Sequence, residues 1–185
     1  MRWKIKCIER TAKNAAVIFP HRQMRILDYN RVVKDLHGHG KDAFLAAIKN
    51  AFSVEPHTGQ AKPAQRGEFG MYLDGQWYRL RINADLVPSD PVARLDVSLL
   101  QANLLDPLLG IKDPRRDSRI DFVGGIRGLS ELEKRVNSGE MQVAFALFAT
   151  PMQDLMAVAD AGEVMPPKST WFEPKLADGL VSHLL

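Results

Sequence analysis

Apolar residues recur along the chain in two spacings, and the shorter one, of two residues, predicts strands. Apolar runs or alternations of strand length occur at residues 1–13, 15–19, 24–33, 69–73, 76–82, 120–123, 141–148 and 180–185. The clearest are residues 69–73 and 76–82, which are separated only by Asp74-Gly75. An Asp-Gly pair between two strands is typical of a type I′ turn, so we predict a β-hairpin here.

Apolar residues at helical spacing, with start and stop signals at their ends, predict four helices. The helices are expected at residues 42–52, 90–105, 130–138 and 151–161. Ser130 with Glu133, and Thr150 with Gln153, have the spacing of capping boxes, in which the first side chain caps the helix. Residues 53–66 hold two prolines and a glycine among few apolar positions, which predicts a loop.

The order of these elements predicts an α+β fold with a mixed β-sheet, a β-hairpin and helices packed mainly on one face. The crossover helices at 130–138 and 151–161 should both cover that face. The chain has 185 residues, a length at which one hydrophobic core is normal. We therefore expect residues 1–185 to form a single α+β domain.

One segment, residues 165–175, fits neither spacing and carries most of the candidate chemistry. It reads Met-Pro-Pro-Lys-Ser-Thr-Trp-Phe-Glu-Pro-Lys, and its adjacent prolines favour an extended, stiff backbone. The cations and hydroxyls on it suit a phosphate or a carboxylate. The alternative is a rigid structural loop that is anchored by Trp171 and Phe172 and whose lysines are only solvated.

A second candidate is Gly124-Gly125, which stands between a predicted strand and a predicted helix. Paired glycines at such a place can bring backbone N–H groups close to an anion, although the segment lacks the ending of a P-loop. Arg127 follows and could bind a phosphate or pair with a nearby carboxylate. The alternative is a tight turn without a ligand.

Composition narrows the remaining classes of function. The chain has 25 basic and 22 acidic residues, a net charge of +3, and the mild excess is typical of a solvated surface rather than of nucleic-acid binding. The single cysteine, Cys7, excludes an intramolecular disulfide and fits a reducing cytoplasm.

His37 and His39 have no second ligand cluster beside them, so we predict no metal site. No apolar run approaches the ~20 residues that span a bilayer, so we predict a cytoplasmic protein without a membrane segment.

Three segments carry a resemblance to a known family: Leu95-Asp-Val-Ser-Leu-Leu100, Arg119-Ile-Asp-Phe-Val-Gly-Gly125 and Met165-Pro-Pro-Lys-Ser-Thr-Trp-Phe-Glu-Pro-Lys-Leu176. They resemble the C-terminal half of the bacterial domain-of-unknown-function family 1015, and residues 26–33 resemble its middle section. That family is remotely similar to ParB and sulfiredoxin-like nucleotide-using proteins and is associated with serine metabolism. The resemblance implies a phosphate- or nucleotide-binding part of a small-molecule kinase-like phosphotransferase, with ADP or ATP and Mg²⁺ as cofactors.

Under this resemblance the candidate phosphate- or nucleotide-binding residues are Lys168, Ser169, Thr170, Lys175, Arg127, Gly124 and Gly125. Glu173 is a candidate acid, base or metal partner. The family's Asp-Gly-His-His-Arg motif is missing from this chain, which implies that the chain is inactive alone. A second copy or a partner chain would then supply the missing N-terminal half. Two other functions stay open: a non-catalytic module that binds another protein through a sheet edge, and nucleic-acid binding.

Overall fold

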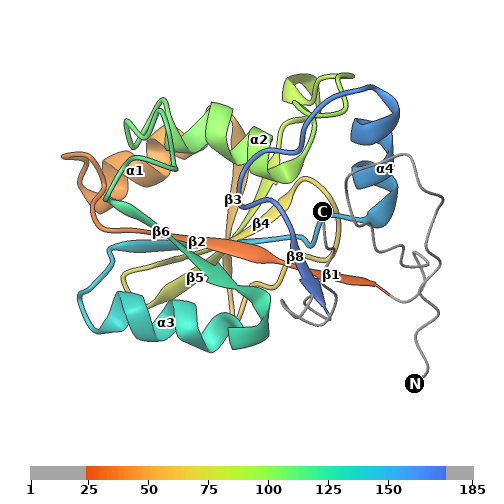
Figure 1. The fold of residues 1–185 in the computed structure, drawn as a ribbon. Coiled ribbons are helices and arrows are strands. Elements are labelled where there is room, and N and C mark those ends of the chain that lie inside the picture. The colour runs from red at the N-terminus through yellow and green to blue at the C-terminus, as the bar shows by residue number, and fades with distance from the viewer. Residues whose placement is uncertain (1–23, 174–185) are drawn as a thin grey trace, which may run out of the picture. The chain divides into compact units, whose positions relative to one another are not determined.

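The computed structural model describes residues 24–173 (Figure 1). The chain divides into a large unit, residues 26–171, and a second unit made of residues 1–25 and 172–185. The strands predicted at 1–13, 15–19 and 180–185 therefore lie outside the described residues. Within the described part, no helix has the length and apolar character needed to cross a membrane.

The large unit is built on a six-stranded sheet with the strand order β3-β5-β4-β7-β2-β6. Its strands are β2 (Tyr29–Val33), β3 (Phe52–His57), β4 (Glu68–Leu73), β5 (Gln76–Ile82), β6 (Ile120–Gly124) and β7 (Val143–Leu147). Two short strands, β1 (Arg25–Leu27) and β8 (Trp171–Glu173), form a separate two-stranded sheet.

The α+β class is confirmed, but the expectation of a mixed sheet is wrong because every pairing in the six-stranded sheet is antiparallel. The helical crossover that suggested parallel pairing is present between β6 and β7. Strands β6 and β7 run in the same direction, and the helix between them carries the chain from one to the other. However, β2 lies between them and pairs with both in the opposite direction. The sequence shows the crossover but does not show which strand separates its two ends.

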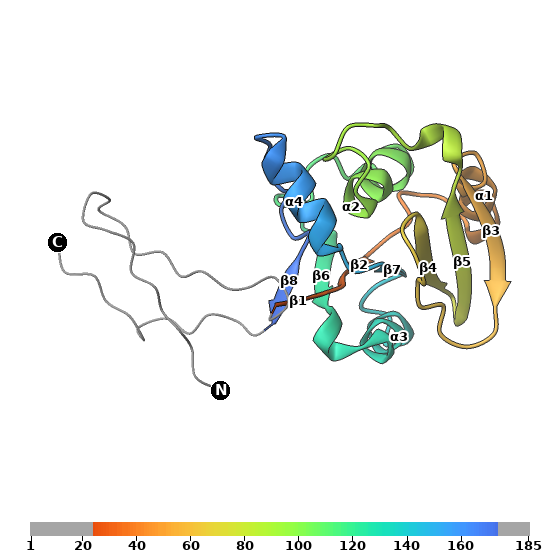
Figure 2. The same cartoon turned by 90° about the vertical axis from the view of Figure 1, so that its right-hand side faces the viewer.

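Helices lie on both faces of the sheet, mainly on one (Figures 1 and 2). Helix α1 (Lys41–Ile48) and helix α2 (Asp96–Leu100), which continues as the π-helix η3 (Gln101–Leu105), cover one face. Helix α3 (Leu129–Asn137) covers the other face, and α4 (Met152–Asp160) follows β7. Short 3₁₀ turns occur at η2 (Ala84–Leu86) and η4 (Gly125–Arg127).

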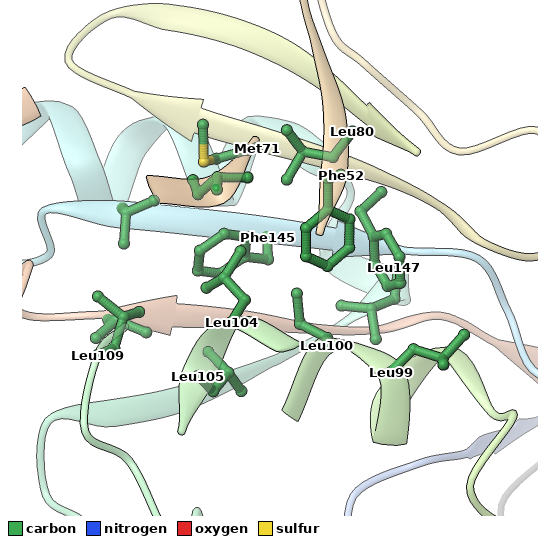
Figure 3. Packing of buried hydrophobic residues seen from close by; sticks show 14 of the residues in the cluster. Phe52, Met71, Leu80, Leu99, Leu100, Leu104, Leu105, Leu109, Phe145 and Leu147 are labelled. Carbon is green, nitrogen blue, oxygen red and sulfur yellow. The ribbon is translucent and has the colours of Figure 1, made fainter. Parts of the chain in front are cut away.

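The larger hydrophobic cluster fills the space between the sheet and α2–η3 (Figure 3). Leu100 and Leu104 of these helices are fully buried against Phe52 and Phe145 of the sheet. A smaller cluster joins Trp77 and other sheet residues to Leu132 of α3. Val158 of α4 belongs to the larger cluster, so the predicted helices 130–138 and 151–161 contact opposite faces, not the same one.

The hairpin prediction is confirmed residue by residue. Strands β4 and β5 pair antiparallel with Leu73 opposite Gln76, which leaves a two-residue loop. Asp74 has φ 49° and Gly75 has φ 77°, the left-handed values that a type I′ turn requires at both positions. Strand β4 pairs with β5 on one side and with β7 on the other, and all six of its residues are buried.

Two predicted elements differ from the structure. The loop expected at 53–66 begins as the edge strand β3, in which Phe52 pairs with Ile82 and Pro56 is tolerated because one side of an edge strand needs no partner. The helix expected at 90–105 is regular only from Asp96. Asp90 does cap a turn, since its Oδ1 accepts hydrogen bonds from the backbone N–H groups of the second and third residues that follow.

Both predicted capping boxes are absent. Helix α3 begins at Leu129 after Gly128, and no side chain caps it. Helix α4 begins at Met152, also without a side-chain cap. The Thr150 hydroxyl instead donates to the backbone oxygen of Ser169 at 3.0 Å. The hydroxyl thus fixes the proline-rich segment rather than the helix.

Candidate functional site

A buried arginine on β2 fixes the proline-rich segment. Arg31 is only 4% exposed, and its guanidinium donates to the Lys168 backbone oxygen at 3.0 Å and to the Tyr29 backbone oxygen. It also lies 5.4 Å from the centre of the Phe122 ring. No ion pair of the described residues includes Arg31. Burial lowers the pKa of Arg31 to about 10, so it remains a cation at neutral pH without a carboxylate partner.

Lys168 stands at the turn of this segment and presents its ammonium to two aromatic rings. The Nζ atom lies 5.7 Å from the centre of the Tyr29 ring and 5.9 Å from that of Phe122. Its backbone has φ 57°, a left-handed conformation that costs a non-glycine residue roughly 1 kcal/mol. The hydrogen bond from Arg31 to the Lys168 oxygen helps to hold this conformation. Two cations therefore share the Phe122 ring.

Gly124 and Gly125 lie so close to neighbouring side chains that neither position has room for a Cβ atom. The indole of Trp171 stacks on Tyr29 at 5.5 Å and lies against Gly124, where an added Cβ would be 2.5 Å from the indole. At Gly125 an added Cβ would be 2.2 Å from the carboxylate of Asp28. The Gly125 N–H also donates to the Asp28 backbone oxygen at 2.8 Å. The Gly125 N–H is thus already used, which favours the packing interpretation of this pair over an anion cradle.

The remaining candidates lie in different surroundings. Ser169 is only 5% exposed, Thr170 is half-buried and Glu173 lies half-buried in β8. Arg127 is exposed and lies 3.8 Å from the carboxylate of Glu131, one helical turn later. Lys175 lies outside the described residues. Lys168 and Gly124 are brought together by the shared Tyr29–Trp171 stack, whereas the described interaction of Arg127 is with Glu131.

The prolines line a cavity of about 540 Å³, here called the Arg31 pocket. Its wall combines Arg31, Phe122, Pro166 and Pro167 with α2–η3 and a charged loop; the other lining residues are Val97, Ser98, Gln101, Leu105, Lys112, Asp113, Pro114 and Arg115. Three cations and one carboxylate face this space, so the lining is net positive. None of the described residues that the sequence predicted as binding residues is among its lining residues: Gly124, Gly125, Arg127, Lys168, Ser169, Thr170 and Glu173 are all absent from the lining.

Gln101 gives the pocket an unused acceptor. Its amide nitrogen donates to the Ile111 backbone oxygen at 2.6 Å, which fixes the amide orientation. Its Oε1 is buried and has no hydrogen-bond partner among the residues that the structure describes. The residue opens the π-helix η3, a geometry that is frequent at functional sites. A ligand with an anionic group and an N–H donor matches these side chains.

Sequence reasoning missed Arg31, Gln101, Lys112 and Arg115. Arg31 could have been noticed as a charged residue inside the strand run Tyr29–Val33, because arginine is rarely buried in a strand without a partner. The charges of the loop at 113–121 pair within the loop: Arg115 lies 3.0 Å from Asp113, and Arg119 lies 2.7 Å from Asp117.

Comparisons with known proteins found one matching family model and several similar solved structures. The profile of a family described as protein of unknown function (DUF1015) matches residues 8–98. The segments 119–125 and 165–176 lie outside that match. The comparison with curated proteins found no match.

Solved structures supply the other likeness. A free serine kinase mutant in complex with AMP matches with a TM-score of 0.52 and 15% identity, over 85% of this chain and 58% of that one. A free serine kinase mutant in complex with ADP has a TM-score of 0.47 and 14% identity, over 80% and 54% of the two chains. A conserved hypothetical protein from Pyrococcus furiosus has a TM-score of 0.48 and 15% identity, over 80% and 56%. The chain spans 58% of the first of these structures and shares its fold.

Proposed function

We propose that the large unit binds the phosphate groups of an adenine nucleotide in the Arg31 pocket, as part of a small-molecule phosphotransferase. The observation that carries the proposal is the buried Arg31, a cation that lines a cavity and has no carboxylate partner among the described residues. A buried charge is costly unless it is compensated. Two backbone oxygens and one aromatic ring compensate it in part, and a phosphate would complete the arrangement.

The surrounding charges favour the same ligand. Lys112 and Arg115 line the pocket, and Lys168 lies on the Phe122 ring that Arg31 also contacts. Phosphoryl transfer depends chiefly on positioning and on neutralising phosphate charge, which these cations can provide. The unused Gln101 oxygen can accept a hydrogen bond from an amino group such as that of adenine. The fold likeness to a free serine kinase in complex with AMP supports an adenine nucleotide.

A magnesium ion would fit this proposal only through the nucleotide. No group of three or more His, Cys, Asp or Glu side chains able to hold a metal occurs within residues 24–173. Mg²⁺ in such enzymes is held largely by substrate phosphates and water, with one or two carboxylates. Asp113 is the carboxylate that lines the pocket, and it would be the one to hold the ion.

The activity of the whole enzyme would require more than this chain. The chain spans 58% of the kinase structure that it matches. The proposal therefore includes a further segment, beyond the residues of this chain, that completes the site for the phosphoryl acceptor. Nucleotide binding by this chain alone can be tested separately from catalysis.

The test is isothermal titration calorimetry of the purified chain with AMP, ADP and ATP, with and without Mg²⁺. Lys168→Ala should weaken nucleotide binding tenfold or more, about 1.4 kcal/mol, with little change in melting temperature. Lys112→Ala should weaken it as well. Lys134→Ala is the matched control, because it removes one exposed charge from α3 on the other face of the sheet.

Three results would contradict the proposal. The first is the absence of saturable heat with all three nucleotides. The second is equal affinity in the wild type, Lys112→Ala and Lys168→Ala, which would make the proline-rich segment structural. The third concerns the control. If the Lys134→Ala control loses as much affinity as Lys168→Ala, the binding is non-specific charge attraction and the proposal fails.

A further inference from the structure

A second cavity, lined by different residues, has the chemistry of an anion site. It measures about 360 Å³ and is here called the Asp96 cavity. Its charged lining residues are Arg66, Arg81, Arg94, Asp96 and Asp154. None of the residues that line it also lines the Arg31 pocket. We propose that the Asp96 cavity binds a small oxyanion, a carboxylate or a phosphate, between the Asp96 carboxyl group and the Arg94 guanidinium.

The first observation is an unused carboxyl oxygen. Asp96 lies in the first turn of α2, and its Oδ1 accepts a hydrogen bond from the Gly67 backbone N–H at 2.9 Å. Its Oδ2 is buried and has no hydrogen-bond partner among the described residues. A buried polar atom without a partner costs about 1–3 kcal/mol, and in native structures such atoms often belong to functional sites.

The second observation is the distribution of the arginines. Arg81 is paired with Glu68 at 2.7 Å, and Arg66 with Asp154 at 2.9 Å. Among the described residues, Arg94 has a single ion pair, a long one of 3.9 Å to the same Asp154. The Arg94 side chain is 40% exposed, so part of its guanidinium can donate to a ligand.

The protonation of Asp96 decides which ligand fits. Burial raises the pKa of Asp96 to about 7, the hydrogen bond from Gly67 opposes this, Asp154 raises it further and Arg66 lowers it. Below that pH the Oδ2 atom carries a proton and becomes a donor. With Asp96 neutral, the charged lining consists of three arginines and one further aspartate, Asp154, so it is net positive. The donor on Asp96 and the fork of Arg94 then suit two oxygens of one anion.

A buried residue of α4 and a neighbouring cavity border the Asp96 cavity. Asp154 is only 6% exposed and lies in the first turn of α4. A narrow neighbouring cavity shares Arg66, Arg94, Asp96 and Asp154 and adds Thr150 to the lining. Thr150 is the residue that holds the Ser169 backbone oxygen. An anion between α2 and α4 would therefore sit beside the anchor of the proline-rich segment, without depending on nucleotide binding there.

The experiment is an NMR titration that follows the Gly67 amide, whose N–H donates to Asp96. Sulfate is the first probe, because it stays dianionic between pH 6 and pH 8 and any pH dependence then belongs to the protein. We expect a saturable shift of the Gly67 resonance at constant ionic strength. Affinity should fall about tenfold from pH 6 to pH 8, as Asp96 ionises with a pKa of about 7. The groups that face Asp96 are Arg66, Arg81, Arg94 and Asp154, and the cavity lining includes no histidine.

Two variants separate the roles. Asp96→Asn keeps a donor at the second oxygen position, so it should bind sulfate with the affinity of the wild type at pH 6 and should lose the pH dependence. Arg94→Ala should weaken binding at least tenfold at both pH values. Arg116→Ala, which removes an 87% exposed arginine outside the cavity, is the matched control and should bind like the wild type.

Acetate and inorganic phosphate at pH 6 then distinguish a carboxylate ligand from a phosphate ligand. The probe of the same class as the natural ligand should bind more tightly than the other. The inference is overturned if the Gly67 resonance shows no saturable shift with sulfate, phosphate or acetate. It is also overturned if Arg94→Ala binds like the wild type, or if Asp96→Asn keeps the full pH dependence. Because nucleotide binding is measured with Lys112→Ala in the Arg31 pocket and with Lys168→Ala beside it, either proposal can fail alone.

Discussion

Asp96→Asn should make the protein more stable than the wild type as pH rises, although it removes a charged group. The pKa of Asp96 is raised from 3.8 to about 7, chiefly by burial. The folded state therefore holds the Asp96 proton more tightly than the unfolded state does. This contribution to stability is fully present below about pH 4 and is lost as pH rises to about 7. Asparagine cannot ionise, and its side-chain oxygen can still accept the bond from Gly67.

The magnitude follows from the pKa difference. A rise of about three pH units corresponds to about 4 kcal/mol, at roughly 1.4 kcal/mol per unit. This is the largest amount by which ionisation of Asp96 can lower the free energy of unfolding between pH 4 and pH 8. The difference between the variant and the wild type should rise by a few kcal/mol over that range, in favour of the variant.

The assay is urea unfolding of both proteins at several pH values, followed by fluorescence of the buried Trp77. The difference between them is the informative quantity, because other carboxylates have the opposite slope. Glu68 and Asp117 have lowered pKa values, so they add stability as pH rises, equally in both proteins. A difference that stays constant from pH 4 to pH 8 would show that Asp96 is not desolvated, and the argument for a proton on its Oδ2 would fall with it.

The hairpin and the edges of the sheet each lead to a further prediction. Gly75→Val should lower the free energy of unfolding by ~1 kcal/mol or more, because Gly75 has φ 77°. Gly75→Asn should cost less, since asparagine tolerates this conformation. If both variants were as stable as the wild type in urea unfolding, the turn assignment would be contradicted. The chain should associate with itself or with a partner, because β3 and β6 lie at the edges of the six-stranded sheet and an edge strand can pair with another chain; light scattering that shows a clean monomer at high concentration would refute self-association.

The elements that sequence predicted best are those set by local chemistry. The hairpin at Asp74-Gly75 needs only a turn pair and two flanking runs, and both are contiguous in the chain. Strand β3 was missed because its partner β5 lies more than twenty residues later, and pairing overrode the two prolines and the glycine that indicated a loop. The capping-box spacing also failed to predict a cap: helix α4 has no side-chain cap, and the Thr150 hydroxyl donates to the Ser169 backbone oxygen, which only the fold brings near.

Sequence could indicate only the part of the candidate site that is contiguous in the chain. The composition of residues 165–175 shows a stiff segment with cations, and the structure places Lys168 of this segment on the Tyr29 and Phe122 rings. Composition could not show that Arg31 would be buried beneath it, because burial depends on the neighbours β6 and β7 on either side of β2. Likewise, Asp96 reads as an ordinary helix-start residue until the Gly67 amide is placed against it.

The arginine on β2 links the two interpretations that sequence left open for the proline-rich segment. A purely structural loop would be held by apolar anchors, and Trp171 on Tyr29 does act as one. A structural role alone does not require a buried guanidinium, which loses hydration and gains only two backbone oxygens and a ring. An apolar residue of similar size could fill that space at lower cost. The charge at this position is therefore better explained by a ligand that approaches through the Arg31 pocket, with the loop serving to position it.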